Sequence, residues 1–135
     1  MLKIKKLDDV ATIPTKANKT DAGYDLYALS SGQVPVGFTE KIKTGVAFGF
    51  PTGVFGLIMD RSSMGSKGIK VMGGVIDNGY TGEILVCLCN MGNHTYSYNK
   101  GDKIAQIVLT PLIETTMEVV DSLSETDRSS KGFGS

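Results

Sequence analysis

The sequence predicts an all-β domain, either a sandwich or a barrel of short strands. Short apolar runs recur along the 135 residues, and 17 glycines lie in and between them. No stretch of about 12 residues repeats its apolar side chains with the period of a helix. Many short strands joined by regular turns are typical of sandwiches and barrels. The length fits one domain, and 41% hydrophobic residues can supply its core.

The N-terminal half contains strands separated by clear turn signals. Leu2 and Ile4 alternate with lysines, as in an edge strand or a half-exposed strand. The sequence Pro51-Thr52-Gly53 predicts a tight turn between the apolar runs at 45–50 and 54–59. A short helix of one or two turns is expected after Arg61.

The C-terminal half has two further strand signals. Residues 84–89 are apolar on both faces of a strand, which predicts a central strand covered on both sides. The runs at 95–98 and 104–109 flank the turn residues 99–102 and predict a hairpin. The last segment, 122–135, is rich in Ser, Gly and charge, so we expect a domain at 1–121 and a mobile arm at 122–135.

Charge and cysteine content exclude several classes of protein. The 14 basic and 14 acidic residues cancel, whereas proteins that coat nucleic acid usually carry a basic excess. Cys87 and Cys89 lack the spacing of a zinc or redox pair and are expected to be core thiols, which suits a reducing compartment. No apolar run suggests a signal peptide or a membrane span. We therefore expect a cytoplasmic protein that binds neither nucleic acid nor membrane.

Asp77 is the first candidate for chemistry. It lies in a glycine-flanked segment, 73–83, that predicts a hairpin whose backbone approaches a ligand closely. A carboxylate there could act as a general base that holds a water molecule. An equally simple interpretation is an Asx turn that only shapes the hairpin.

Other polar residues follow or interrupt apolar strands. Arg61, Ser62 and Ser63 could hold phosphate oxygens or form a solvated loop. Asp25 could reach a cation through water or be a surface carboxylate. Gln106 interrupts an apolar run, so it needs a hydrogen-bond partner or contact with solvent. The single histidine, His94, is expected in a loop.

Five segments, taken in order, resemble the five motifs of the trimeric dUTP pyrophosphatase (dUTPase) family. These segments are Asp21–Leu26, Asp60–Met64, Gly74–Gly82, Gly101–Ile107 and Arg128–Ser135. The segments are distributed along the chain, so the resemblance extends over essentially its whole length. The resemblance implies a distorted β jelly roll, a homotrimer with active sites at subunit interfaces, and an arm that closes over a neighbouring subunit's site.

The resemblance also implies the reaction, which is hydrolysis of dUTP to dUMP and pyrophosphate. This reaction lowers dUTP and supplies the dTTP precursor. Asp77 would orient and deprotonate the water that attacks the α-phosphorus. Mg²⁺ would bridge the triphosphate oxygens, and Asp25 would hold one of its waters.

The substrate-binding residues implied by the resemblance form three groups. The residues expected at the phosphates are Arg61, Ser62, Ser63 and Gln106. The residues expected to read the uracil are Gly74, Val75, Ile76 and Leu85. The residues expected to cover the nucleoside and clamp the outer phosphate are Tyr80, Arg128, Phe133 and Gly134. Within the last group, Tyr80 would pack under the deoxyribose and Phe133 would stack over the uracil.

The chain departs from the usual motifs at several positions. Asp60 stands where the family usually has proline, Ser63 where it has glycine, and Gly79 where an acidic residue is common. Ser129 and Lys131 replace glycines in the last motif. None of these changes removes a residue expected to do chemistry. Two alternative functions remain: a dCTP deaminase-like enzyme, or a regulatory protein that uses this scaffold to bind an unknown protein partner.

Overall fold

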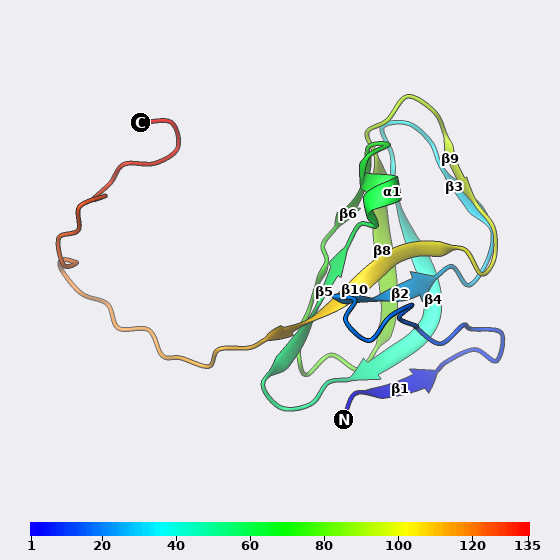
Figure 1. The fold of residues 1–135 in the computed structure, drawn as a ribbon, viewed down its shortest axis with the longest axis horizontal. Coiled ribbons are helices and arrows are strands. Elements are labelled where there is room, and N and C mark those ends of the chain that lie inside the picture. Colours follow the sequence, from blue (N-terminus) through cyan, green and yellow to red (C-terminus); the bar gives the residue numbers. More distant parts are fainter.

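The computed structural model describes residues 1–135 and is built from two four-stranded sheets and a two-stranded ribbon, all antiparallel (Figure 1). The first sheet contains, in spatial order, β1 (Lys3–Lys6), β4 (Thr39–Gly49), β8 (Glu83–Asn90) and β6 (Ile69–Met72). The second contains β2 (Gly23–Tyr27), β10 (Lys103–Pro111), β5 (Val54–Met59) and β7 (Val75–Ile76). The ribbon joins β3 (Gly32–Val34) to β9 (Tyr96–Tyr98). The only helix is α1 (Ser62–Gly65). The all-β prediction is therefore confirmed.

The core lies between the inner faces of the two four-stranded sheets. Alternate residues of β8, namely Ile84, Val86 and Leu88, are completely buried. Leu26 of β2 and Ile107 of β10 meet them from the other sheet within one cluster of buried apolar residues. Because apolar area removed from water drives folding, this shared cluster holds the two sheets together.

The outer face of β8 differs from the sequence-based prediction. Cys87 and Cys89 are only half-buried, so the prediction that both thiols are core residues is wrong. The strand is central, as predicted, between β4 and β6. Within this chain, however, only one of its faces is packed against a second layer. Apolar residues on both faces of a strand do not by themselves show whether one face or both faces are covered.

The hairpin predicted at 95–109 is also wrong. Its turn exists, since the Asp102 N–H donates to the Asn99 carbonyl at 3.0 Å, and the Asn99 N–H donates to Asp102 Oδ2 at 2.8 Å. The strands on either side pair elsewhere: β9 pairs with β3, and β10 pairs with both β2 and β5. The turn thus carries the chain from the ribbon into the second sheet.

The edge strand β1 and the turn at 51–53 mark the end of the molecule from which the C-terminal segment leaves. β1 is an edge strand, as predicted, and the turn at 51–53 links β4 in one sheet to β5 in the other. The backbone N–H of Leu112 donates to the carbonyl of Gly53 in that turn at 2.8 Å. Beyond Leu112 the chain has no regular structure and extends away from the sheets (Figure 1). The chain contains no helix with the length and apolar character that a membrane crossing needs.

Candidate active site

A pocket forms where the chain between β6 and β8 changes sheets. β6 pairs with β8 as far as Met72 and Cys87. Gly73 then adopts a positive φ of 61°, and the next residues leave to form β7 against β5. A side chain on Gly74 would collide with the carbonyl of Ile58, so this crossing needs glycine. The two arms of the predicted 73–83 hairpin are therefore not paired with each other, and that prediction is wrong. The gap between them is the pocket.

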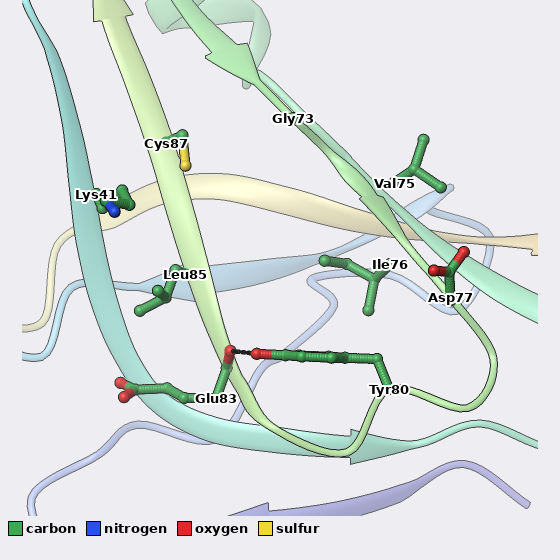
Figure 2. Close-up of a pocket in the computed structure, with 9 residues that line it drawn as sticks. All are labelled: Lys41, Gly73, Val75, Ile76, Asp77, Tyr80, Glu83, Leu85 and Cys87. Carbon is green, nitrogen blue, oxygen red and sulfur yellow. Dashed lines mark hydrogen bonds between the residues drawn. The ribbon is translucent and has the colours of Figure 1, made fainter.

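The pocket has a volume of about 240 Å³ and contains both predicted and unpredicted residues (Figure 2). The predicted site residues that line it are Val75, Ile76, Asp77, Tyr80 and Leu85. The lining residues that sequence reasoning missed are Lys41, Gly73, Glu83 and Cys87. Gly74, also predicted for the site, is not among the lining residues, although its neighbours Gly73 and Val75 are. The pocket is thus assembled from β4, β7, β8 and the loop after β7.

Cys87 shares a face of β8 with Leu85, so its place in the pocket could have been inferred from strand alternation. Lys41 comes from β4, which pairs with β8 through the register Lys41 to Cys87. That register links segments far apart in the sequence, so no local signal could have revealed Lys41.

Tyr80 forms one wall of the pocket. Its hydroxyl donates to the Glu83 carbonyl at 2.8 Å, and its backbone N–H donates to the Asp77 carbonyl at 3.0 Å (Figure 2). Gly82 lies against the phenol, where an added Cβ would be 2.6 Å from the hydroxyl oxygen. The loop is therefore folded around Tyr80, and the residue as a whole remains 43% exposed.

Asp77 lies at the end of β7, at the edge of the pocket (Figure 2). Its carboxylate is exposed and makes no hydrogen bond or ion pair within the chain. Both oxygens are consequently available to accept a hydrogen bond from water. The Asx-turn interpretation fails in its simple form, because no side-chain hydrogen bond from Asp77 shapes the loop.

A second polar cluster lies on β2 and β10, in the same sheet as β7, and includes residues that follow β5. Asp25 of β2 has Arg61 Nε 3.7 Å from its Oδ1 and Lys103 Nζ 3.2 Å from its Oδ2. Gln106 of β10 pairs in register with Asp25, and its Nε2 donates to the carbonyl of Asp60 at 3.3 Å. Gln106 is half-buried and has a partner, so solvent alone does not satisfy it. This cluster presents two cations and an amide.

The segment after Arg61 forms the short helix that the sequence predicts. Ser62 and Ser63 occupy its first two positions, and both are exposed. Arg61 is the N-cap residue and makes no side-chain capping bond. The hydroxyls of Ser62 and Ser63, which follow Arg61 directly, make no hydrogen bond within the chain.

No hydrogen bond or ion pair joins the Asp77 pocket to the Asp25 cluster within one chain. Along β5, Gly56 pairs with Ile76 and Met59 pairs with Gln106. Three residues of strand separate those pairs by roughly 10 Å. The arm residues Arg128, Phe133 and Gly134 lie in the segment that extends away from both groups (Figure 1). The predicted residues thus form two clusters and an arm.

The donor set suits a magnesium ion that is held mainly by a substrate. No group of three or more His, Cys, Asp or Glu residues could hold a metal by itself. Asp25 is a single, partly exposed carboxylate whose oxygens still have capacity to accept a hydrogen bond from a metal-bound water. Mg²⁺ usually keeps several waters and takes few protein ligands. The residues present fit that type of contact.

Known proteins with similar sequences share one family. The family model for dUTPase matches residues 9–135. The deoxyuridine 5'-triphosphate nucleotidohydrolase of Kluyveromyces lactis is 40% identical, covering 99% of this chain and 92% of its own length. Its counterpart from Variola virus is 41% identical, covering 93% of this chain and 85% of its own.

Solved structures confirm the expected fold. The Staphylococcus bacteriophage 80alpha dUTPase with dUPNHPP has a TM-score of 0.92 and 29% identity, with 99% of this chain and 96% of that chain covered. A mutant dUTPase from phage phi11 of S. aureus, described for its coordination of a structural Mg(II) ion, has a TM-score of 0.83 and 28% identity, with 90% and 97% covered. By sequence and by fold, this chain belongs to the dUTPase family.

Proposed function

We propose that this chain hydrolyses dUTP to dUMP and pyrophosphate, as the names of its relatives indicate for those proteins. One observation carries the proposal. The unpaired carboxylate of Asp77 stands at the edge of a pocket that opens between β7 and β8 and has Tyr80 as one wall. A base without partners beside a nucleoside-sized slot is suited to activating water against a bound nucleotide.

Asp77 has the role of general base. A carboxylate is a weak base, so it works only if the water is well placed and the charge on the phosphate is offset. Asp77 accepts the proton of the attacking water, whose oxygen forms a bond to the α-phosphorus as pyrophosphate leaves. Because Asp77 has no competing hydrogen bond in the chain, it is free to orient that water.

The walls of the pocket give selectivity for the base and sugar. Backbone groups at Gly74–Ile76 and Leu85 read the acceptor, donor and acceptor pattern of uracil. A buried polar site that is mismatched to its ligand discriminates by about 10⁴–10⁵-fold. The narrow gap between β7 and β8 excludes the methyl group of thymine, and the ring of Tyr80 packs under the deoxyribose. A ribose hydroxyl would clash there or remain without a partner.

The second cluster binds the phosphates. Arg61, Ser62, Ser63 and Gln106 donate hydrogen bonds to the triphosphate oxygens, which suits the two unpartnered hydroxyls. Asp25 would accept a hydrogen bond from a water of the Mg²⁺ that accompanies the substrate. The bound ion offsets the charge of the triphosphate. Net neutrality of the chain is compatible with such a local cationic site.

A homotrimer with shared active sites, as the resemblance to trimeric dUTPases implies, is part of this proposal. A nucleotide seated in the Asp77 pocket of one subunit would extend its phosphates to the Asp25 cluster of another. The arm, 122–135, would then close over a neighbouring subunit's site. Phe133 stacks over the uracil, with Gly134 beside it, and Arg128 clamps the outer phosphate.

The experiment is pyrophosphate release with Mg²⁺ from dUTP, dCTP, dTTP and UTP, each offered separately to the wild type and to Asp77→Asn. We expect release from dUTP alone and its loss in the variant. Ammonia release from dCTP would favour the deaminase alternative. No release from any nucleotide would overturn the proposed function and favour a binding role for the scaffold.

A further inference from the structure

Asn78 follows the proposed base directly, and its side chain turns away from the pocket into the body of the molecule. Its Nδ2 donates to the carbonyl of Pro51 at 2.9 Å and to that of Val54 at 2.7 Å. Pro51 lies in the turn between β4 and β5, and Val54 is the first residue of β5. One half-buried amide therefore ties the loop after β7 to a turn 24 and 27 residues away in sequence.

The two hydrogen bonds require an amide at this position. The amide nitrogen of Asn carries two donor hydrogens, one for each carbonyl. A carboxylate there would point acceptors at acceptors, and a smaller side chain would leave both carbonyls without this partner. A generic turn signal such as Asn-Gly does not explain these contacts, because they lie outside the loop.

The two hydrogen bonds of Asn78, called the clamp below, act on the turn that carries Asp77 and Tyr80. The backbone N–H of Tyr80 donates to the Asp77 carbonyl, so Asn78 occupies the middle of a turn bounded by Asp77 and Tyr80. The Asp77 carboxylate makes no hydrogen bond or ion pair in the chain, and a Cβ added to Gly79 would have no atom within 4 Å. The location of Asp77 thus depends on its backbone, and Asn78 fixes that backbone to the rest of the fold.

We propose that Asn78 is a positioning residue, which holds the Asp77 carboxylate at the distance from the substrate that water activation requires. The inference rests on the proposed function, since it assigns Asp77 the role of base. A displacement of about 1 Å at a reacting group can cost on the order of 100-fold in rate. Loss of the clamp should therefore lower kcat much more than it changes KM.

A second asparagine offers a matched control. Asn90 also donates through Nδ2 to two carbonyls, those of Val34 at 2.9 Å and His94 at 2.8 Å. It lies at the far end of β8 and does not line the pocket. Replacing Asn90 removes the same kind of double hydrogen bond, in a more buried place, without touching the Asp77 turn. It also removes the bond that Asn90 Oδ1 accepts from the Gly92 N–H at 2.9 Å, so it is the more severe change to the fold.

The experiment compares Asn78→Ala, Asn78→Asp and Asn90→Ser with the wild type at a temperature where all are folded. For Asn78→Ala we expect kcat to fall about 10-fold or more while KM changes less than about 3-fold. Asn78→Asp should also lower kcat, because a carboxylate cannot donate to the two carbonyls. Asn90→Ser should lower Tm at least as much but keep kcat within about 2-fold of wild type.

Hydrogen exchange at the Tyr80 amide tests the clamp independently of turnover. We expect faster exchange in Asn78→Ala than in wild type or Asn90→Ser, since that amide closes the clamped turn. Unchanged exchange, or an unchanged kcat in Asn78→Ala, would overturn the inference. An equal loss of kcat in Asn90→Ser would reduce Asn78 to a general stabilising role. A wild type without dUTP hydrolysis would instead refute the proposed function, and the exchange result would still report whether the clamp exists.

Discussion

Asp60 and Lys70 form an ion pair, with Oδ1 and Nζ 2.8 Å apart, that joins the end of β5 to β6 across the short helix between them. Asp60 stands where related motifs usually have proline. Proline would fix the backbone locally, whereas the aspartate restrains the same segment through a side chain on another strand. The Asp60 carbonyl also accepts from Gln106, so the pair supports the proposed phosphate cluster.

Lys70→Met should destabilise the protein slightly near neutral pH. The hydrogen bond from Lys70 is the main reason that the pKa of Asp60 lies below its ordinary value of 3.8. A lowered carboxyl pKa adds stability above about pH 4, and that stability is lost as the pH falls through the folded-state value. Since the Lys70 side chain is 46% exposed, we expect at most about 1 kcal/mol in the free energy of unfolding.

Urea unfolding at about pH 7 and about pH 3 would measure this effect. The difference between wild type and Lys70→Met should shrink at the lower pH. Lys67→Met is the control, because Lys67 is exposed and makes no ion pair. A difference independent of pH would show that lost packing, and not the ion pair, is responsible.

Asp77→Asn should abolish most turnover while leaving nucleotide binding intact. The amide keeps the shape of the side chain but cannot take a proton from water, and general-base catalysis typically contributes about 10²–10⁴-fold. Steady-state kinetics and calorimetric binding of a non-hydrolysable dUTP analogue would check both parts. Asp9→Asn, which changes an exposed carboxylate far from the pocket, should behave as wild type. Full activity of Asp77→Asn would end its assignment as the base.

Asp25→Asn should increase the Mg²⁺ concentration needed for half-maximal turnover by several-fold. The substitution removes the charge that can hold a metal-bound water, and it also releases Arg61 and Lys103 from their shared partner. A titration of turnover with Mg²⁺ at saturating dUTP would measure the shift. Asp121→Asn, in the exposed segment after β10, provides the comparison. An identical Mg²⁺ dependence in both variants would argue against a role for Asp25 near the metal.

Truncation after Thr126 should greatly reduce turnover without unfolding the sheets. The removed residues include Arg128 and Phe133, neither of which contacts the folded body. Light scattering should show the same oligomer for the truncated and full chains, and circular dichroism the same melting temperature. Kinetics that match the full chain would remove the proposed closing role of the arm.

The fold class could be predicted from sequence because alternation and turn residues are local signals. Which strands pair with one another could not be predicted in this way. The turn between Asn99 and Asp102 formed as predicted, yet its flanking strands pair with β3, β2 and β5 instead of with each other. Backbone pairing is decided by which distant strand covers an edge, and a single sequence carries little of that information.

Prediction of the site had the same limit, because contacts between segments far apart in the sequence leave no local signal. Asp77 and Tyr80 could be identified because the glycines and the motif surround them in one segment. The pocket itself arises from a change of sheet at Gly73, which a hairpin interpretation missed. Lys41 and the acceptors of Asn78 come from other strands and turns, so only the folded structure brings them to the site.

The hydrogen bond between Leu112 and Gly53 fixes the point at which the segment 113–135, which ends in the arm, leaves the folded body. About 23 residues follow that anchor, enough to reach roughly 75 Å when fully extended. Behaving as a flexible coil, the same segment would keep its tip within about 25–30 Å on average. The local concentration of Phe133 around any pocket in that range is then on the order of millimolar. Since length alone admits several pockets, the direction in which the chain leaves Leu112 would select the pocket that the arm closes under the proposed function.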